Sequence, residues 1–114
     1  MKQVRKKSFR ILATSFDYRP RLGGVATCAY EVCRALSRMD GVELKILAPI
    51  SPGSEEFDLK SGVNTVRKKV FTSSARSVPV LTAQLSEEIA RFKPDVVLNF
   101  LWFPGGVSAY FSPV

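Results

Sequence analysis

The sequence of 114 residues predicts an α/β fold built on a parallel sheet. Short apolar runs alternate with amphipathic helical patterns along the chain. The first run, at 10–16, is apolar at consecutive positions (Ile11, Leu12, Ala13), as in a strand covered on both faces. A Pro-Arg-Leu-Gly-Gly sequence at 20–24 and a helical pattern follow it. This strand–loop–helix order is how α/β proteins direct backbone N–H groups toward a phosphate.

The next segments continue the alternation. A helix is expected at 25–38, where one apolar stripe recurs at helical spacing. The stripe consists of Val25, Ala29, Val32, Cys33 and Leu36. Gly41 suits the left-handed turn that follows a helix, and a second strand is expected at 43–48, closed by Pro49. Residues 50–64 hold a Pro-Gly-Ser sequence and three acidic residues, so we expect a loop there.

The second half of the chain repeats this pattern. A third strand is expected at 65–71, and its basic residues at 67–69 mark it as an edge strand. After a small-polar linker at 73–77, a second helix is expected at 80–92. It should end there, because Pro94 cannot continue a helix. The apolar face of that helix is formed by Leu81, Leu85, Ile89 and Phe92.

A fourth strand is expected at 95–101, and a Pro-Gly-Gly sequence at 104–106 begins a third helix over 107–111. Strands linked through helices require parallel neighbours and right-handed crossovers. The predicted sheet is therefore Rossmann-like, with about four strands in the order 3-2-1-4 and helices flanking it.

In this order, the topological switch point lies between the first and fourth strands. Their carboxyl ends bring the Gly23-Gly24 loop and the 99–106 segment together around one crevice, which is the expected ligand site. The candidate binding residues are Gly23, Gly24, Arg19, Arg21, Asn99 and Trp102.

Each candidate also has a plainer interpretation. A Gly-Gly pair after a strand is often only a tight connection, loop arginines are more often solvated, and a tryptophan such as Trp102 is more often a packing residue. The glycines do not form a Gly-x-Gly-x-x-Gly pattern, so a nicotinamide dinucleotide site is not supported.

The net charge of +7 is concentrated near the N-terminus. Residues 1–21 hold seven basic residues and one acidic residue, and the remainder is nearly neutral. We expect a basic tail at 1–8 that is either solvated or in contact with an anionic membrane surface or a phosphate group. Nucleic acid is not an expected partner, because no aromatic–basic platform or recognition-helix pattern accompanies the charge.

Several kinds of chemistry are excluded by composition. The chain has no histidine, so it holds no Ser-His or Cys-His nucleophile arrangement and lacks the commonest metal ligand. Cys28 and Cys33 lie about 140° apart on one expected helix, so we expect two buried thiols and neither a disulfide nor a metal site. No secretion signal or membrane-spanning run is recognisable, so we expect a cytoplasmic protein, either free or peripheral at the inner face of the membrane.

Two segments resemble a known family. Residues 10–27, followed by a helix and the sequence Gly-Val-Glu-Leu-Lys-Ile-Leu-Ala-Pro at 41–49, look like the start of a family 4 glycosyltransferase with the GT-B fold. Residues 92–106, Phe-Lys-Pro-Asp-Val-Val-Leu-Asn-Phe-Leu-Trp-Phe-Pro-Gly-Gly, are similar to that family's fourth strand and the loop after it. The resemblance covers roughly residues 9–111, nearly the whole chain.

The resemblance implies two Rossmann-like domains that face each other across a cleft, with residues 9–114 forming part of the N-terminal, acceptor-side domain. It implies transfer of a sugar from a nucleotide-sugar donor to a saccharide or lipid-linked acceptor, with retention and without a metal or other cofactor. Gly23 and Gly24 would approach the donor diphosphate or the transferred sugar. The donor-binding domain would lie beyond this chain, so we expect the chain alone to transfer no sugar.

One position departs from the family pattern. Family members often place a histidine near the end of the fourth strand, and residues 98–100 contain none here. Either Asn99 substitutes for it or the protein is not a working catalyst, so no catalytic residue is assigned. The chain is thus either part of a nucleotide-sugar glycosyltransferase or a non-catalytic α/β binding or interaction module derived from a truncated one.

An incomplete domain would also leave apolar side chains uncovered. We therefore expect the chain to self-associate. The residues involved would be Phe100, Leu101, Trp102, Phe103, Tyr110 and Phe111.

Overall fold

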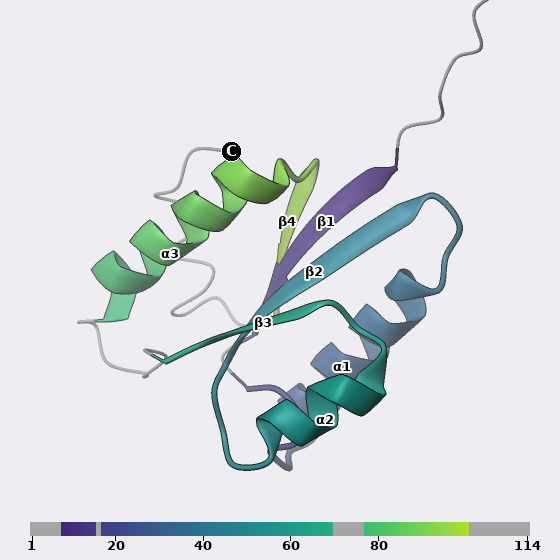
Figure 1. Cartoon of the computed structure of the whole chain (residues 1–114), viewed down its shortest axis with the longest axis vertical. Coiled ribbons are helices and arrows are strands. Elements are labelled where there is room, and N and C mark those ends of the chain that lie inside the picture. The colour runs from purple at the N-terminus through teal and green to yellow at the C-terminus, as the bar shows by residue number, and fades with distance from the viewer. Residues whose placement is uncertain (1–7, 16, 70–76, 101–114) are drawn as a thin grey trace, which may run out of the picture.

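The computed structural model describes residues 8–15, 17–69 and 77–100. In these ranges the chain forms a parallel sheet with helices on both faces, which confirms the predicted fold class (Figure 1). The elements are β1 (Phe9–Thr14), α1 (Gly24–Ser37), β2 (Val42–Pro49), α2 (Ser54–Ser61), β3 (Thr65–Lys68), α3 (Ser77–Phe92) and β4 (Val96–Asn99).

The strands of the described sheet lie in the order β3-β2-β1-β4, as predicted. All neighbouring strands are parallel, and Ile11 of β1 lies beside Leu44 of β2 on one side and Val96 of β4 on the other. At the carboxyl ends of the two strands, Thr14 of β1 lies beside Asn99 of β4. The switch point is therefore where the sequence predicts it.

Alternate side chains of the central strands pack into two separate cores. Ile11 and Ala13 of β1 belong to the core that contains residues of α1 and α2, whereas Leu12 packs with Leu85 and Phe92 of α3. Figure 1 shows the corresponding layers, with α1 and α2 on one face of the sheet and α3 on the other. Burial on both faces explains why these strands are apolar at consecutive positions.

Charged side chains also hold α3 on the sheet. Glu88 is 2% exposed, and its Oε1 atom lies 3.3 Å from Lys45 Nζ on β2. Its Oε2 atom lies 3.9 Å from Lys68 Nζ on β3. At the helix end, Arg10 Nη1 of β1 donates to the Phe92 carbonyl oxygen at 2.8 Å. These contacts join α3 to three strands and so fix the point from which the chain enters β4.

Several predicted boundaries are wrong by a few residues. The first, third and fourth strands end earlier than expected, at Thr14, Lys68 and Asn99. The first and fourth strands end together because they pair with each other, and the ladder stops where β1 turns into its loop. Helix α3 begins at Ser77, inside the expected linker. The helix expected at 107–111 lies outside the described residues.

The buried face of α1 is rotated from the predicted stripe. Ala26, Ala29 and Cys33 are buried, whereas Val25 and Val32 are 37% and 36% exposed. The prediction that Ala29 and Cys33 face the core is confirmed. The same prediction for Val25 and Val32 was wrong. Small side chains on the sheet side allow the helix backbone to approach β1 and β2 closely, which leaves the β-branched residues at the flank.

Helix α2 occupies a segment that was predicted to be a loop, and this prediction was wrong. The helix, Ser54–Ser61, is bounded by Gly53 and Gly62, both in the left-handed conformation with φ of 80° and 75°. The sequence of this helix has no apolar stripe. The helix contacts the rest of the fold through the half-buried side chains of Phe57 and Asp58. One aromatic residue and one ion pair leave no periodic pattern in the sequence.

Candidate functional site

A side-chain hydrogen bond joins the carboxyl ends of β1 and β4. The Thr14 hydroxyl donates to Asn99 Oδ1 at 2.5 Å, and the Phe100 amide donates to the Thr14 carbonyl oxygen at 3.1 Å. Because the Asn99 amide oxygen accepts from Thr14, the Nδ2 group is the hydrogen-bond donor of this side chain.

Residues 15–23, here called the glycine loop, connect β1 to α1. The loop ends at Gly23, whose φ of 145° and ψ of 161° belong to a region that only glycine adopts readily. Gly23 is the N-cap of α1, and no side chain among the described residues caps the start of this helix. The first-turn N–H groups therefore point outward from the positive end of the helix dipole. A Cβ atom on Gly24 would meet none of the described atoms within 4 Å, so the backbone there is open to a ligand.

A buried aromatic group anchors the glycine loop. Tyr18 is fully buried, and its ring lies 6.1 Å from that of Tyr30 on α1 and 6.5 Å from that of Phe57 on α2, edge to face in both pairs. Tyr30 and Phe57 are themselves 5.1 Å apart. The loop is thus packed onto the helices that cover one face of the sheet.

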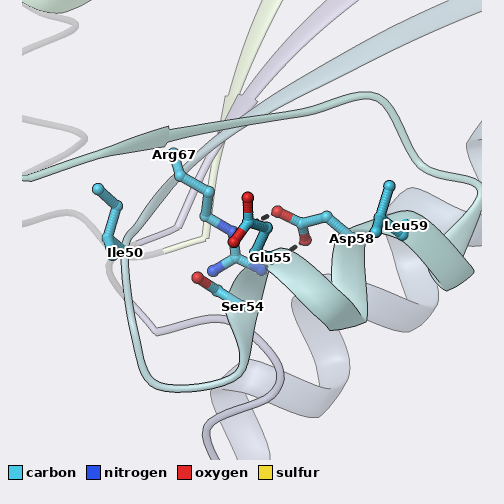
Figure 2. A pocket seen from close by; sticks show the side chains of 6 residues that line it. All are labelled: Ile50, Ser54, Glu55, Asp58, Leu59 and Arg67. Atoms are coloured by element: carbon cyan, nitrogen blue, oxygen red, sulfur yellow. Dashed lines mark hydrogen bonds and ion pairs between the residues drawn. The ribbon is translucent and has the colours of Figure 1, made fainter.

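A pocket of about 490 Å³ lies beside α2 (Figure 2). It is lined by Ile50, Ser54, Glu55, Asp58, Leu59 and Arg67. Arg67 Nε and Nη2 donate to the two carboxylate oxygens of Asp58 at 2.9 and 2.7 Å, and the paired side chains are 9% and 20% exposed. Since this pairing neutralises the guanidinium, the pocket does not provide an anion site.

The predicted glycine and asparagine positions fall at the two sides of the switch point. Gly23 and Gly24 begin α1, which follows β1, and Asn99 ends β4. The sheet register brings Asn99 directly beside Thr14 at the end of β1. Trp102 lies outside the described residues.

The two predicted arginines differ in their surroundings. The Arg19 guanidinium carbon lies 5.9 Å from the centre of the Tyr30 ring, so this side chain packs on α1. Arg21 Nη1 lies 3.5 Å from Asp17 Oδ1, with the two side chains 52% and 38% exposed. Exposed pairs of this kind contribute little to stability, so an anion would displace Asp17 from Arg21 at low cost.

Three residues that fix the glycine loop were not predicted as site residues: Tyr18, Asp58 and Arg67. Arg67 was interpreted only as one of the basic residues that mark an edge strand, and its side chain is largely buried. One sequence signal was available. A glycine on each side of a short segment, with glutamates in its first turn and a lysine in its last, is a helix signature, and recognising it would have placed Asp58 on a helix facing the third strand.

The two thiols differ in exposure. Cys28, which was predicted to be buried, is exposed on α1, and Cys33 is buried; both are free. Burial raises the pKa of the Cys33 thiol from 9.0 to about 12, and burial likewise raises the pKa of the Tyr18 hydroxyl. In the part of the chain that the structure describes, no three His, Cys, Asp or Glu residues gather as metal ligands, and no helix is long and apolar enough to cross a membrane.

Comparison with known proteins identifies the family. The sequence profile of Glycosyltransferase Family 4 matches residues 22–112. No curated protein matches the chain. The matched range begins at the end of the glycine loop and runs through β4, so it includes both sides of the switch point. The chain therefore belongs to glycosyltransferase family 4.

Proposed function

We propose that this chain forms the acceptor-side domain of a nucleotide-sugar-dependent glycosyltransferase, with the donor diphosphate lying against the first turn of α1. The observation that carries the proposal is the uncapped start of α1 after Gly23-Gly24, in a chain that belongs to family 4. The reaction would transfer a sugar to a saccharide or lipid-linked acceptor, with retention and without a metal.

The geometry of the α1 start suits this role. Glycine at positions 23 and 24 presents no Cβ, so phosphate oxygens can reach the first-turn N–H groups. Arg21 adds a half-exposed cation in the same loop. As the sugar leaves the donor, negative charge grows on the diphosphate, and fixed N–H donors at that position would stabilise it.

The other side of the crevice would contact the sugar. The Asn99 Nδ2 group is a donor for a sugar hydroxyl or a phosphate oxygen. Trp102, three residues further along, is proposed to stack on a sugar ring. The basic tail at 1–8 would hold the protein at an anionic cytoplasmic membrane surface, where a lipid-linked acceptor is found.

Amide chemical shifts of the ¹⁵N-labelled chain test the proposal. Uridine, guanosine and adenosine diphosphates are titrated separately, with the three nucleosides and sodium sulfate at equal ionic strength as controls. The diphosphates should shift the amides of Gly23, Gly24 and Val25, and the nucleosides should not. Equal shifts with nucleosides, or shifts confined to the basic tail, would overturn the proposal and favour a non-catalytic interaction module.

A further inference from the structure

We propose that Arg67 is a positioning residue for the proposed phosphate site, because it fixes the glycine loop through the backbone of Arg19. The hydrogen bond between Arg67 and Arg19 is observed in the structure. The phosphate ligand rests on the proposed function.

Arg67 connects β3 to three other parts of the fold through its guanidinium group. In addition to its paired bonds with Asp58 of α2, Nη1 donates to the Pro49 carbonyl oxygen at the end of β2, and Nη2 donates to the Arg19 carbonyl oxygen in the glycine loop, both at 2.8 Å. The guanidinium carbon also lies 5.2 Å from the centre of the buried Tyr18 ring. One side chain on β3 thus holds the loop, α2 and β2 together.

This arrangement leaves Arg67 unsuited to binding a ligand directly. Three of its nitrogen atoms already donate to four acceptors, and the Asp58 carboxylate balances its charge. Figure 2 shows the guanidinium directed at Asp58. Any influence on a bound phosphate must therefore pass through the loop.

Pro20, the next residue of the loop, lies near the start of α2, since a Cβ atom added to Gly53, the N-cap of α2, would lie 3.9 Å from Pro20 Cγ. The observed anchor of the loop is the hydrogen bond that the Arg19 carbonyl oxygen accepts from Arg67. Only a few residues separate Arg19 from Gly23, so the position of Arg19 limits where the first N–H groups of α1 point. In a site that depends on the positions of its groups, a displacement of about 1 Å can lower the reaction rate by about two orders of magnitude.

Arg67→Lys isolates this geometry, because it keeps the positive charge but has a single nitrogen that cannot reach Asp58, Pro49 and Arg19 together. Hydrogen exchange is measured at the Arg21 amide, which donates to the Tyr18 carbonyl oxygen at 3.1 Å, and at the Ile46 amide in the sheet. Inorganic pyrophosphate binding is measured on the same samples. Arg91→Lys, at an exposed arginine of α3, is the matched control.

In Arg67→Lys, we expect exchange at Arg21 to become about tenfold faster while exchange at Ile46 changes little. The dissociation constant for pyrophosphate should rise at least about fivefold, and Arg91→Lys should change neither quantity. Should Arg67→Lys fail to fold, Asp58→Asn provides a milder disturbance of the same contact, with about threefold faster exchange expected at Arg21.

The two proposals fail in different ways. Unchanged exchange at Arg21 in both variants would overturn the positioning role of Arg67, whatever pyrophosphate does. Faster exchange at Arg21 with undiminished pyrophosphate affinity would also overturn it, because the contact would then be merely structural. If pyrophosphate shifts no amide at the start of α1 in the unaltered chain, the proposed function is wrong, while the exchange data still decide whether Arg67 fixes the loop.

Discussion

The buried pair of Glu88 and Lys45 makes Lys45→Met a sharp test of how α3 is held on the sheet. The two side chains are 3% and 16% exposed, with 3.3 Å between Oε1 and Nζ. In the variant, Glu88 would retain the more distant cations of Lys68 and Arg91, each 3.9 Å away. Leaving a buried charge without its partner costs about 3–5 kcal/mol. Because the two remaining cations offset part of this cost, we expect about 2 kcal/mol.

Urea unfolding and thermal melting measure this loss. Lys45→Met should lower the free energy of unfolding by about 2 kcal/mol, which is about 8 °C in melting temperature for a chain of this size. The double variant Lys45→Met/Glu88→Met should recover most of the loss, since apolar side chains replace a buried ion pair at little cost.

The exposed pair Arg34–Glu31 on α1 supplies the control cycle, with 3.7 Å between the charged atoms and side chains 40% and 55% exposed. Its coupling energy should be about 0.5 kcal/mol or less. A coupling between Lys45 and Glu88 no larger than this control would refute the reasoning, because burial would then not strengthen the pair.

The remaining predictions concern the glycine loop and the two thiols. Gly23→Ala should destabilise the fold by about 1–3 kcal/mol in urea unfolding, because its φ of 145° strains any side chain, whereas Gly24→Ala should stay within about 0.5 kcal/mol; equal effects would contradict the assigned backbone. As pH rises from 9.0 toward about 12, the unfolded chain loses the Cys33 proton before the folded chain does, so the free energy of unfolding should fall by up to about 1.4 kcal/mol per pH unit. Cys33→Ala should make this decline shallower, and an identical slope would show that Cys33 does not contribute. A maleimide should label Cys28 alone in the folded chain and both thiols in urea, and mass spectrometry of native protein labelled at Cys33 would contradict its burial.

The sheet could be predicted because its determinants are local. Strands covered on both faces are apolar at consecutive positions, and glycine and proline mark their ends. The strand order then followed from right-handed crossovers together with the Rossmann-like arrangement. The shifted face of α1 could not be predicted as reliably. Ala26 and Val25 both fit a helical apolar stripe, and only packing against β1 and β2 selects the smaller residue.

The places of the candidate residues in the fold could be predicted, and the side chains that support the glycine loop could not. Gly23 and Asn99 were placed by topology, because strand order determines which loops meet. The Arg67–Arg19 hydrogen bond joins residues 48 positions apart and depends on α2, which has no apolar period. Such a contact leaves no repeating pattern in the sequence, and a basic residue on an edge strand has the same local signature whether it is solvated or buried.

Pyrophosphate binding to Gly24 variants tests the central claim, that a phosphate approaches the open backbone at the start of α1. Dissociation constants are measured at constant ionic strength for the unaltered chain, Gly24→Ala and Gly24→Val. Affinity should fall stepwise, with Gly24→Val at least about tenfold weaker, a difference of about 1.4 kcal/mol. Melting temperatures should stay close together, because a Cβ at this position meets no described atom within 4 Å. Binding of pyrophosphate to Gly24→Val as tightly as to the unaltered chain would contradict the account.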